Sequence, residues 1–408
     1  MIQEKTDIRK NAGIALVVLI FVAFISLGLP DGLLGVAWPE MRRSFGLPLD
    51  ALGVLLIAST TGYLISSFFN GYFMAKLGVG GLLAASCALT AMALLGYTLT
   101  PFWFLMPFFA VLSGLGAGAI DAGLNVYVEA NYGEGFMQWM HASFGVGVTL
   151  GPIIMTRGLG LTGNWRTGYI IVGTAQLILA LIFFLTISLW GDRQKEDRQK
   201  ETSGGNAVLI GKEEGGVSNP ALMETLKYLP AWISIALFFV YTGIEFSFGH
   251  WTYSLLTESR GINPEIAGFL AGGYWAFFTI GRILAGFLAY RINSMSLFRG
   301  GILLGLTGSL LLALDMGQWV SFLGVALAGM AIAPIFPALV SSTSYRVGEE
   351  HTTNTIGMQM AAAGLGGALL PGLAGVLARN ISLETIPFFL ILLFIVLLGL
   401  DLMAKRTH

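Results

Sequence analysis

Twelve apolar stretches, each long enough to cross a lipid bilayer, constrain this chain more than any other feature of its sequence. A helix needs about 20 consecutive apolar residues to span the hydrocarbon core of a bilayer. The stretches lie at residues 13–38, 50–75, 79–99, 102–128, 137–157, 167–190, 231–256, 265–290, 297–315, 318–346, 353–378 and 385–404. The pattern predicts an all-α membrane protein with twelve transmembrane helices.

The composition supports a membrane protein and excludes several other classes. Charged residues make up 11% of the chain, whereas soluble domains carry roughly 25%. The 55 glycines suit closely packed membrane helices. The formal net charge of -1 gives no reason to expect a nucleic-acid partner. The single cysteine, Cys87, excludes an intrachain disulfide, and we assign no metal ligand.

One long polar segment divides the apolar stretches into two equal sets. It runs from about Gly191 to Lys227 and combines mixed charges with a Gly/Ser stretch, which is typical of a solvated linker. It predicts an N-terminal six-helix bundle at 1–190, a linker at 191–229 and a C-terminal six-helix bundle at 230–408.

The basic residues between the stretches predict the orientation in the membrane. With the N-terminus in the cytoplasm, the inner segments hold fifteen Lys or Arg residues and the outer segments hold six. Cytoplasmic loops carry an excess of these residues. We therefore expect a multi-pass protein of the cell inner membrane with both termini and the linker in the cytoplasm.

The two sets of stretches carry an internal repeat. Adding 215 to a position in the first half gives a matching residue in the second, and near the fifth stretch the offset becomes 219. The pairs at the first offset are Gly28 with Gly243, Gly46 with Gly261, Gly71 with Gly286, Lys76 with Arg291, Gly114 with Gly329 and Gly133 with Gly348. The second offset pairs Gly145 with Gly364, Gly147 with Gly366 and Pro152 with Pro371. Single glycine matches are expected by chance, but a constant offset predicts two pseudo-symmetric bundles that rock about a central site.

The segment 71–78 (Gly-Tyr-Phe-Met-Ala-Lys-Leu-Gly) resembles the signature of the major facilitator superfamily between its second and third helices. Ala75 replaces the acidic residue of that signature. The copy in the second half contains Arg282 and Arg291. The resemblance implies the major facilitator fold and a cytoplasmic gate, for which we expect Lys76, Arg282 and Arg291.

A narrower resemblance is to the fucose–proton symporter group, which includes hexose transporters. It rests on the segments 118–125 (Gly-Ala-Ile-Asp-Ala-Gly-Leu-Asn), 143–145 (Ser-Phe-Gly) and 241–245 (Tyr-Thr-Gly-Ile-Glu). Asp31 lies about one turn before the position of that group's proton-carrying aspartate. The resemblance implies transport of a sugar.

Asp121 and Asp31 are the candidates for the ion-coupling residues. Ionisable groups inside a membrane are costly and face a cavity or a partner. Asp31 lies between Pro30 and Gly32, which loosen the helix, so it is suited to hold a proton or Na⁺; the alternative is a carboxylate near the outer end that touches water. Asp121 shares a helix face with Asn125, four residues on; the alternative is a structural hydrogen bond to helix one or two.

The candidates for substrate binding combine hydrogen-bonding tips with flat apolar faces. Sugars stack their C–H faces on aromatic rings and bind carboxylates and amides through their hydroxyls. The set comprises Asn125, Gln138, His141, Tyr241, Glu245, Trp251, Tyr274, Trp275 and Gln359. The alternatives are a packed hydrogen-bonding histidine at 141 and an interfacial aromatic belt for Trp251, Tyr274 and Trp275.

The leading functional hypothesis is a monomeric secondary transporter that takes up a hexose-like sugar, coupled to H⁺ or Na⁺ and without any other cofactor. The chain has no glycine loop of the Walker type to bind ATP and no catalytic constellation, so we do not expect an enzyme. Arg282 is expected near the cytoplasmic end of its helix, and the lack of a central basic residue argues against anionic substrates. The alternatives are a proton-coupled exporter of a hydrophobic drug or metabolite and a membrane receptor, which the repeat disfavours.

Overall fold

The computed structural model describes residues 2–132, 134–190, 222–288 and 291–406, and within these ranges it contains helices and no strand. Twelve helical segments are long and apolar enough to cross a membrane, which confirms the predicted number. The helices are α1 (Ile2–Phe45), η1 (Leu49–Ala51), α2 (Leu52–Phe68), α3 (Asn70–Leu99), η2 (Trp103–Leu105), α4 (Met106–Asn131), α5 (Glu134–Thr162), α6 (Arg166–Leu185), α8 (Leu222–Thr225), α9 (Leu229–Ser254), η3 (Leu255–Ser259), α10 (Pro264–Leu288), α11 (Ser294–Ala313), α12 (Gln318–Ile332), α13 (Ile335–Ser341), α14 (Thr343–Val347), α15 (Glu349–Asn380) and α16 (Thr385–Arg406).

Several helix boundaries differ from the sequence-based expectation, and the first two spans show the difference clearly. The first span was expected to end at residue 38, but α1 continues to Phe45 and carries Arg42 and Arg43 in its last turn. The second span was expected to reach residue 75, but α2 ends at Phe68. The chain changes direction within α3 at Gly78, whose φ of 65° is available to glycine at little cost.

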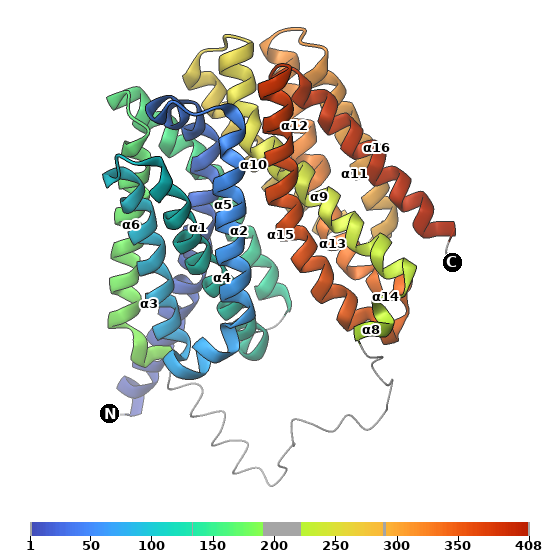
Figure 1. The fold of residues 1–408 in the computed structure, drawn as a ribbon. Coiled ribbons are helices and arrows are strands. Elements are labelled where there is room, and N and C mark those ends of the chain that lie inside the picture. Colours follow the sequence, from blue (N-terminus) through green and yellow to red (C-terminus); the bar gives the residue numbers. More distant parts are fainter. Residues whose placement is uncertain (1, 133, 191–221, 289–290, 407–408) are drawn as a thin grey trace.

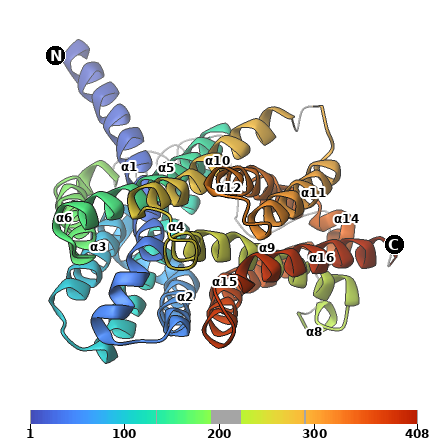
Figure 2. The same cartoon turned by 90° about the horizontal axis from the view of Figure 1, so that it is seen from above.

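The helices form two bundles of the same internal packing (Figures 1 and 2). In the first bundle, α1 packs on α5, α2 on α4, and α3 on both α4 and α6. In the second bundle, α9 packs on α15, α10 on α12, and α11 on both α12 and α16. We call the bundles the N-half (α1–α6) and the C-half (α9–α16).

The repeat in the sequence is also a repeat in the packing. A Cβ atom added to Gly114 would lie 1.9 Å from the carbonyl oxygen of Ser59, and one added to Gly329 would lie 2.4 Å from that of Tyr274. The same 215 positions separate the two glycines and the two carbonyls. These close backbone approaches explain why both positions lack a side chain.

The two halves meet at one end of the molecule. Helices α5 and α10, α2 and α15, and α1 and α9 pack against each other across the interface. In Figure 1 the ribbons converge where α1 ends and diverge towards α8. We call these the Arg42 end and the linker end.

The apolar core follows the same asymmetry. One buried cluster joins N-half residues such as Trp38 and Trp165 to C-half residues such as Trp251 and Tyr274. A second cluster, with Phe24, Phe183 and Trp190, lies within the N-half alone. The halves therefore share a continuous apolar core, while part of the N-half keeps a core of its own.

Candidate functional site

A chain of hydrogen bonds links three helices of the N-half. The Tyr63 hydroxyl of α2 donates to Asp121 Oδ2 of α4. The Asn125 amide, one turn further along α4, donates to Asp121 Oδ1 over 2.9 Å. His141 of α5 lies with Nε2 3.0 Å from Asn125 Oδ1. The structure therefore brings three predicted site residues, Asp121, Asn125 and His141, into one network.

The donors in this network follow from its geometry. Because the Asn125 amide nitrogen faces a carboxylate, its Oδ1 atom is left as the acceptor for His141. His141 Nε2 must then carry the hydrogen, and the ring is held edge-on to Phe24 at 5.2 Å between centroids. Asp121 is thus held by two neutral donors rather than by a basic side chain.

Asp31 lies in the middle of α1 and faces the same region. Asp31 is exposed, although it lies well inside the membrane span Gly13–Phe45. It is close enough to Asp121 and to Glu245 of the C-half for their charges to interact. Three carboxyl groups from α1, α4 and α9 therefore share one electrostatic environment.

The C-half contributes a buried acid with a basic neighbour. Glu245 lies on α9 and interacts with the charge of Arg282 on α10. The Arg282 guanidinium stacks over the Phe278 ring at 4.4 Å. Its charge also acts on His141 across the interface between the halves.

The position of Arg282 bears on one prediction from the sequence. The sequence predicted Arg282 near the cytoplasmic end of its helix. Because no other basic residue was expected in the centre, anionic substrates were disfavoured. Arg282 lies six residues before the end of α10, and its charge still acts on both Glu245 and His141, so a basic group is within electrostatic range of the candidate site. Its assignment to the gate stays a prediction.

The aromatic candidates of the C-half are packed inside the bundle. Trp251 is fully buried and donates from Nε1 to the carbonyl of Pro371 over 2.9 Å. The buried Tyr274 hydroxyl donates to the backbone carbonyl of Glu245 over 2.9 Å, and Trp275 packs against Tyr274. In this conformation these three residues stabilise the bundle, and contact with a substrate would require the packing to open.

The remaining candidates lie in different places. Tyr241 is buried beside Glu245 on α9, and Gln359 of α15 is buried and bonded to Thr343 over 3.2 Å. Gln138 lies on α5, but its side chain falls outside the described residues. Lys76 is exposed, with its ammonium group over the Tyr72 ring at 4.5 Å, and Arg291 is exposed. Their roles in binding or gating stay predictions.

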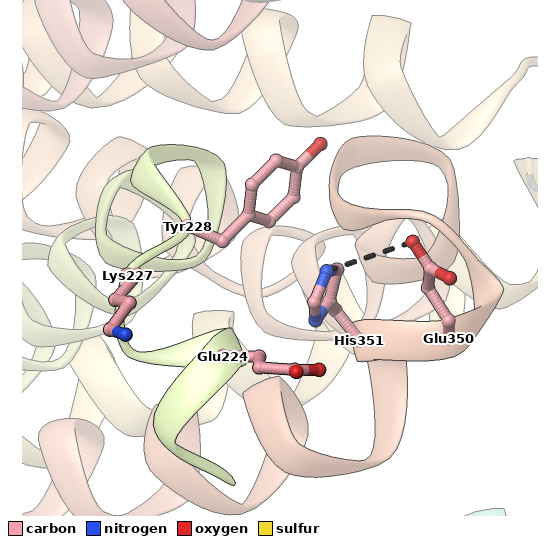
Figure 3. A pocket seen from close by; sticks show the side chains of 5 residues that line it. All are labelled: Glu224, Lys227, Tyr228, Glu350 and His351. Carbon is pink, nitrogen blue, oxygen red and sulfur yellow. Dashed lines mark ion pairs between the residues drawn. The ribbon is translucent and has the colours of Figure 1, made fainter. Parts of the chain in front are cut away.

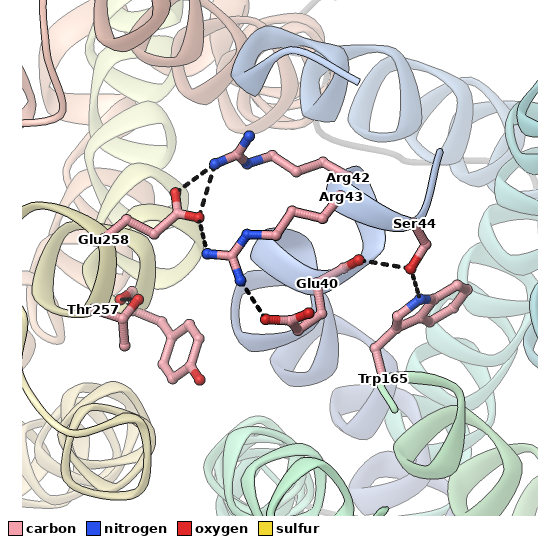
Figure 4. A network of polar contacts seen from close by, with 8 residues as sticks. Glu40, Arg42, Arg43, Ser44, Trp165, Thr257 and Glu258 are labelled. Atoms are coloured by element: carbon pink, nitrogen blue, oxygen red, sulfur yellow. Dashed lines mark hydrogen bonds and ion pairs between the residues drawn. The ribbon is translucent and has the colours of Figure 1, made fainter. Parts of the chain in front are cut away.

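A polar network at the Arg42 end joins the two halves (Figure 4). Arg42 Nη2 donates to both carboxylate oxygens of Glu258, each over 2.8 Å, and Arg43 Nη2 donates to Oε1 over 2.7 Å. Arg43 also pairs with Glu40, which holds it at the end of α1. We call Arg42, Arg43 and Glu258 the latch.

Two further ion pairs cross between the halves near the latch. Arg157 pairs with Glu265 over 2.7 Å, and Arg379 pairs with Asp50 over 3.1 Å. Both pairs are more exposed than that of Arg42 with Glu258. The Arg42 end is therefore held closed by charge as well as by apolar packing.

The sequence analysis missed the latch, although a signal was available. Arg43 and Glu258 are separated by the same 215 positions as the glycine pairs of the repeat. Opposite charges at equivalent positions of two pseudo-symmetric halves can pair when those positions lie near the axis that relates the halves. Tyr63 was also missed, and nothing in the sequence distinguishes it from other membrane tyrosines.

A separate pocket of about 320 Å³ lies at the linker end (Figure 3). It is lined by Glu224, Lys227, Tyr228, Glu350 and His351. The rings of Tyr228 and His351 stack at 4.7 Å, and His351 Nδ1 lies 3.0 Å from the Thr225 hydroxyl. These contacts attach α8 and the start of α9 to the first turn of α15.

The fold defines a multi-pass membrane protein of two repeated six-helix bundles. The sequence profile of the Major Facilitator Superfamily matches residues 17–371 and 233–406. The chain belongs to this superfamily of membrane transporters.

Several characterised proteins are similar along most of the chain. The Bypass of stop codon protein 6 of Saccharomyces cerevisiae is 24% identical, over 91% of this chain and 78% of its own. The glucose/mannose transporter GlcP of Bacillus subtilis is 23% identical, over 95% and 94%. The human sodium-dependent glucose transporter 1 is 23% identical, over 87% and 72%.

Solved structures confirm the fold. A bacterial homologue of the human lysosomal transporter Spinster, in an inward-facing and occupied conformation, gives a TM-score of 0.75 at 13% identity and covers 97% of each chain. The transporter FucP in its outward conformation gives 0.61 at 16% identity, over 96% of this chain and 99% of its own. The predicted resemblance to the superfamily is confirmed.

Proposed function

We propose that this protein is a secondary active transporter that takes up a hexose-like sugar in symport with a cation. The observation that carries the proposal is the group of carboxyls, amide and imidazole around Asp121 and Asn125, which lies beside the charged residues of the opposite half. Such groups suit the hydroxyls of a polyol. Two relatives that match most of this chain bear the names of glucose transporters.

The contacts between the halves support alternating access. The latch, two further ion pairs and a shared apolar core hold the Arg42 end closed. Transport then requires these contacts to break while new ones form at the linker end. From the excess of basic residues, we place the linker end and both termini in the cytoplasm. The proposal further assumes a monomer in the cell inner membrane.

Asp31 and Asp121 form the coupling pair in this proposal. Neither is paired with a basic side chain among the described residues, and their charges repel each other. A cation that neutralises one of them relieves the repulsion on the other. Because Asp121 anchors the network of Asn125 and His141, cation binding changes the groups offered to the sugar.

The test is the variant Asp121→Asn, which keeps the size and part of the hydrogen bonding but removes the charge. Counterflow needs only sugar binding and alternating access, so it should persist in proteoliposomes. Concentrative uptake driven by an ion gradient should be lost. The matched control is Asp315→Asn, an exposed acid on the loop before α12, which should behave as wild type.

Two results would contradict the proposal. Gradient-driven uptake at the wild-type rate in Asp121→Asn would make Asp121 a structural residue. Stabilisation of the purified protein by lipophilic cations, and by none of a panel of hexoses, would favour export of a hydrophobic compound.

A further inference from the structure

A proline in α1 determines the surroundings of Asp31. Pro30 has no N–H group, so the carbonyl of Ser26 one turn earlier lacks its helical donor. Gln176 of α6 replaces that donor, since its Nε2 atom donates to the Ser26 carbonyl over 2.6 Å. The helix defect beside Asp31 is thereby repaired by a side chain from another helix.

This repair leaves one oxygen without a partner. Gln176 is only 1% exposed, and its Oε1 atom has no hydrogen-bond partner among the described residues. The amide cannot turn around, because a carbonyl would then face the Ser26 carbonyl. A buried polar atom without a partner costs about 1–3 kcal/mol, so a ligand for it is expected.

Gln176 and Asp31 line the same small cavity inside the N-half. The cavity has a volume of about 20 Å³, and its other polar lining residues are Ser26, Ser59, Thr90 and Ser113. This is the size needed for about one water molecule or one small ion. Its lining residues come from α1, α2, α3, α4 and α6.

The cavity presents mainly acceptors. The Ser26 hydroxyl donates its hydrogen to the Ala23 carbonyl over 2.8 Å, and the Thr90 hydroxyl donates to the Ser86 carbonyl over 3.1 Å. Both oxygens therefore keep only lone pairs for the cavity. No hydrogen bond to the Asp31 carboxylate is found in the described part of the chain.

We propose that this cavity is a Na⁺ site, with Asp31 and Gln176 Oε1 as its principal ligands. One carboxylate and several neutral oxygens match a monovalent hard cation, whereas a divalent ion in protein sites takes more oxygen ligands or more charge. Across the described residues, no cluster of three or more His, Cys, Asp or Glu side chains offers a transition-metal site.

The site deepens the proposed function, on which its role in coupling rests. Bound Na⁺ neutralises Asp31, whose charge otherwise acts on Asp121 and Glu245. The ion thus changes the electrostatics of the sugar network without touching the sugar. Binding of Na⁺ to the cavity itself does not depend on the identity of the sugar.

The experiment is thermal unfolding of the purified full-length protein in NaCl, KCl or choline chloride at constant ionic strength and pH. Cys87 is the only cysteine and is fully buried, so a thiol-reactive dye reports unfolding without further labelling. We expect a saturating rise in Tm with Na⁺ and none with K⁺, because a ligand that binds only the folded state stabilises it.

Three variants make the test specific. Asp31→Asn should lose the Na⁺-dependent rise in Tm, and Ser113→Ala should shift its half-saturation to higher Na⁺ by several fold. Asp315→Asn, the control, should keep the wild-type response. Because Ser113→Ala removes only one hydroxyl, it keeps the test decisive if Asp31→Asn does not fold.

The outcomes separate this inference from the proposed function. A Tm that is the same in NaCl and KCl at every pH, or a Na⁺ response retained in Asp31→Asn, would overturn the Na⁺ site even if a hexose stabilises the protein. A Na⁺ response lost in Asp31→Asn, without stabilisation by any hexose, would support the site and refute sugar transport.

Discussion

The N-half and the C-half have the same helix packing, but the acidic residues inside their membrane spans have different neighbours. In the N-half, Asp121 accepts hydrogen bonds from the neutral side chains of Tyr63 and Asn125, and Asp31 has no hydrogen bond among the described residues. In the C-half, Glu245 has the charge of Arg282 beside it. The comparison is consistent with the proposed cation-coupling role of Asp31 and Asp121 in the N-half.

The difference arises at equivalent positions. Adding 215 to Asp31 gives Phe246, the neighbour of Glu245, so α1 and α9 carry an acid at nearly the same place. The position equivalent to Arg282 in the N-half is Ser67. One basic residue, present in one half and absent in the other, therefore separates a compensated acid from an uncompensated one.

Basic residues compensate other acids of the C-half as well. Arg299 pairs with the buried Asp401 over 2.8 Å, and Arg260 binds Glu384 over 2.7 Å and contacts Asp315. Arg346, between α13 and α15, is buried among hydroxyls and a carbonyl; this burial lowers its pKa to about 10. The acids Asp401, Glu384 and Asp315 of the C-half are thus each paired with an arginine, unlike Asp31 and Asp121 of the N-half.

The largest expected effect comes from removing the compensating charge. Arg282→Met removes the basic charge that acts on the buried Glu245, and a buried acid left without such a charge is destabilising. We expect a large fall in Tm for Arg282→Met and substantial recovery in the double variant Arg282→Met/Glu245→Gln. Asp31→Asn, in the half without a basic partner, should cause a much smaller fall.

Two results would contradict the difference between the halves. Equal falls in Tm for Arg282→Met and Asp31→Asn, or no recovery in the double variant, would mean that Arg282 does not compensate Glu245.

An intermediate effect is expected at the latch that joins the halves. In the pair of Arg42 with Glu258 the side chains are 21% and 11% exposed, whereas Arg157 and Glu265 are 60% and 58% exposed. Glu258→Gln should favour opening of the Arg42 end by about 1–3 kcal/mol, or roughly 5–150-fold in population. The matched control, Glu265→Gln, should change it by about 0–1 kcal/mol, because exposed pairs are screened.

Spin labels on the ends of α1 and α9 would measure the distance distribution at the Arg42 end. A longer distance in Glu258→Gln than in Glu265→Gln supports the latch. The same distribution in both variants would show that apolar packing alone keeps this end closed.

The smallest effect is expected from the connection between the halves. Residues 203–216 lie outside the described residues, and their Gly/Ser and mixed-charge composition offers little apolar surface to bury. Shortening Ser203–Gly216 should leave sugar affinity unchanged in an equilibrium binding assay. A large loss of affinity would mean that the segment packs on one of the halves and contributes to the difference between them.

The sequence alone determined the membrane class, the twelve helices and the repeat, because bilayer thickness acts on local sequence, and the cost of charge in a membrane singled out the candidate acids, whose roles stay predictions. The helix ends were less predictable: α1 continues through Arg42 and Arg43, which pair with Glu258, a residue distant in the chain. The tertiary structure decided which groups meet, as when Tyr63 reaches Asp121 and Gln176 reaches the carbonyl beside Pro30. Such contacts depend on the rotation and axial position of helices that are far apart in the sequence. The residues adjacent in the chain do not determine that relative placement.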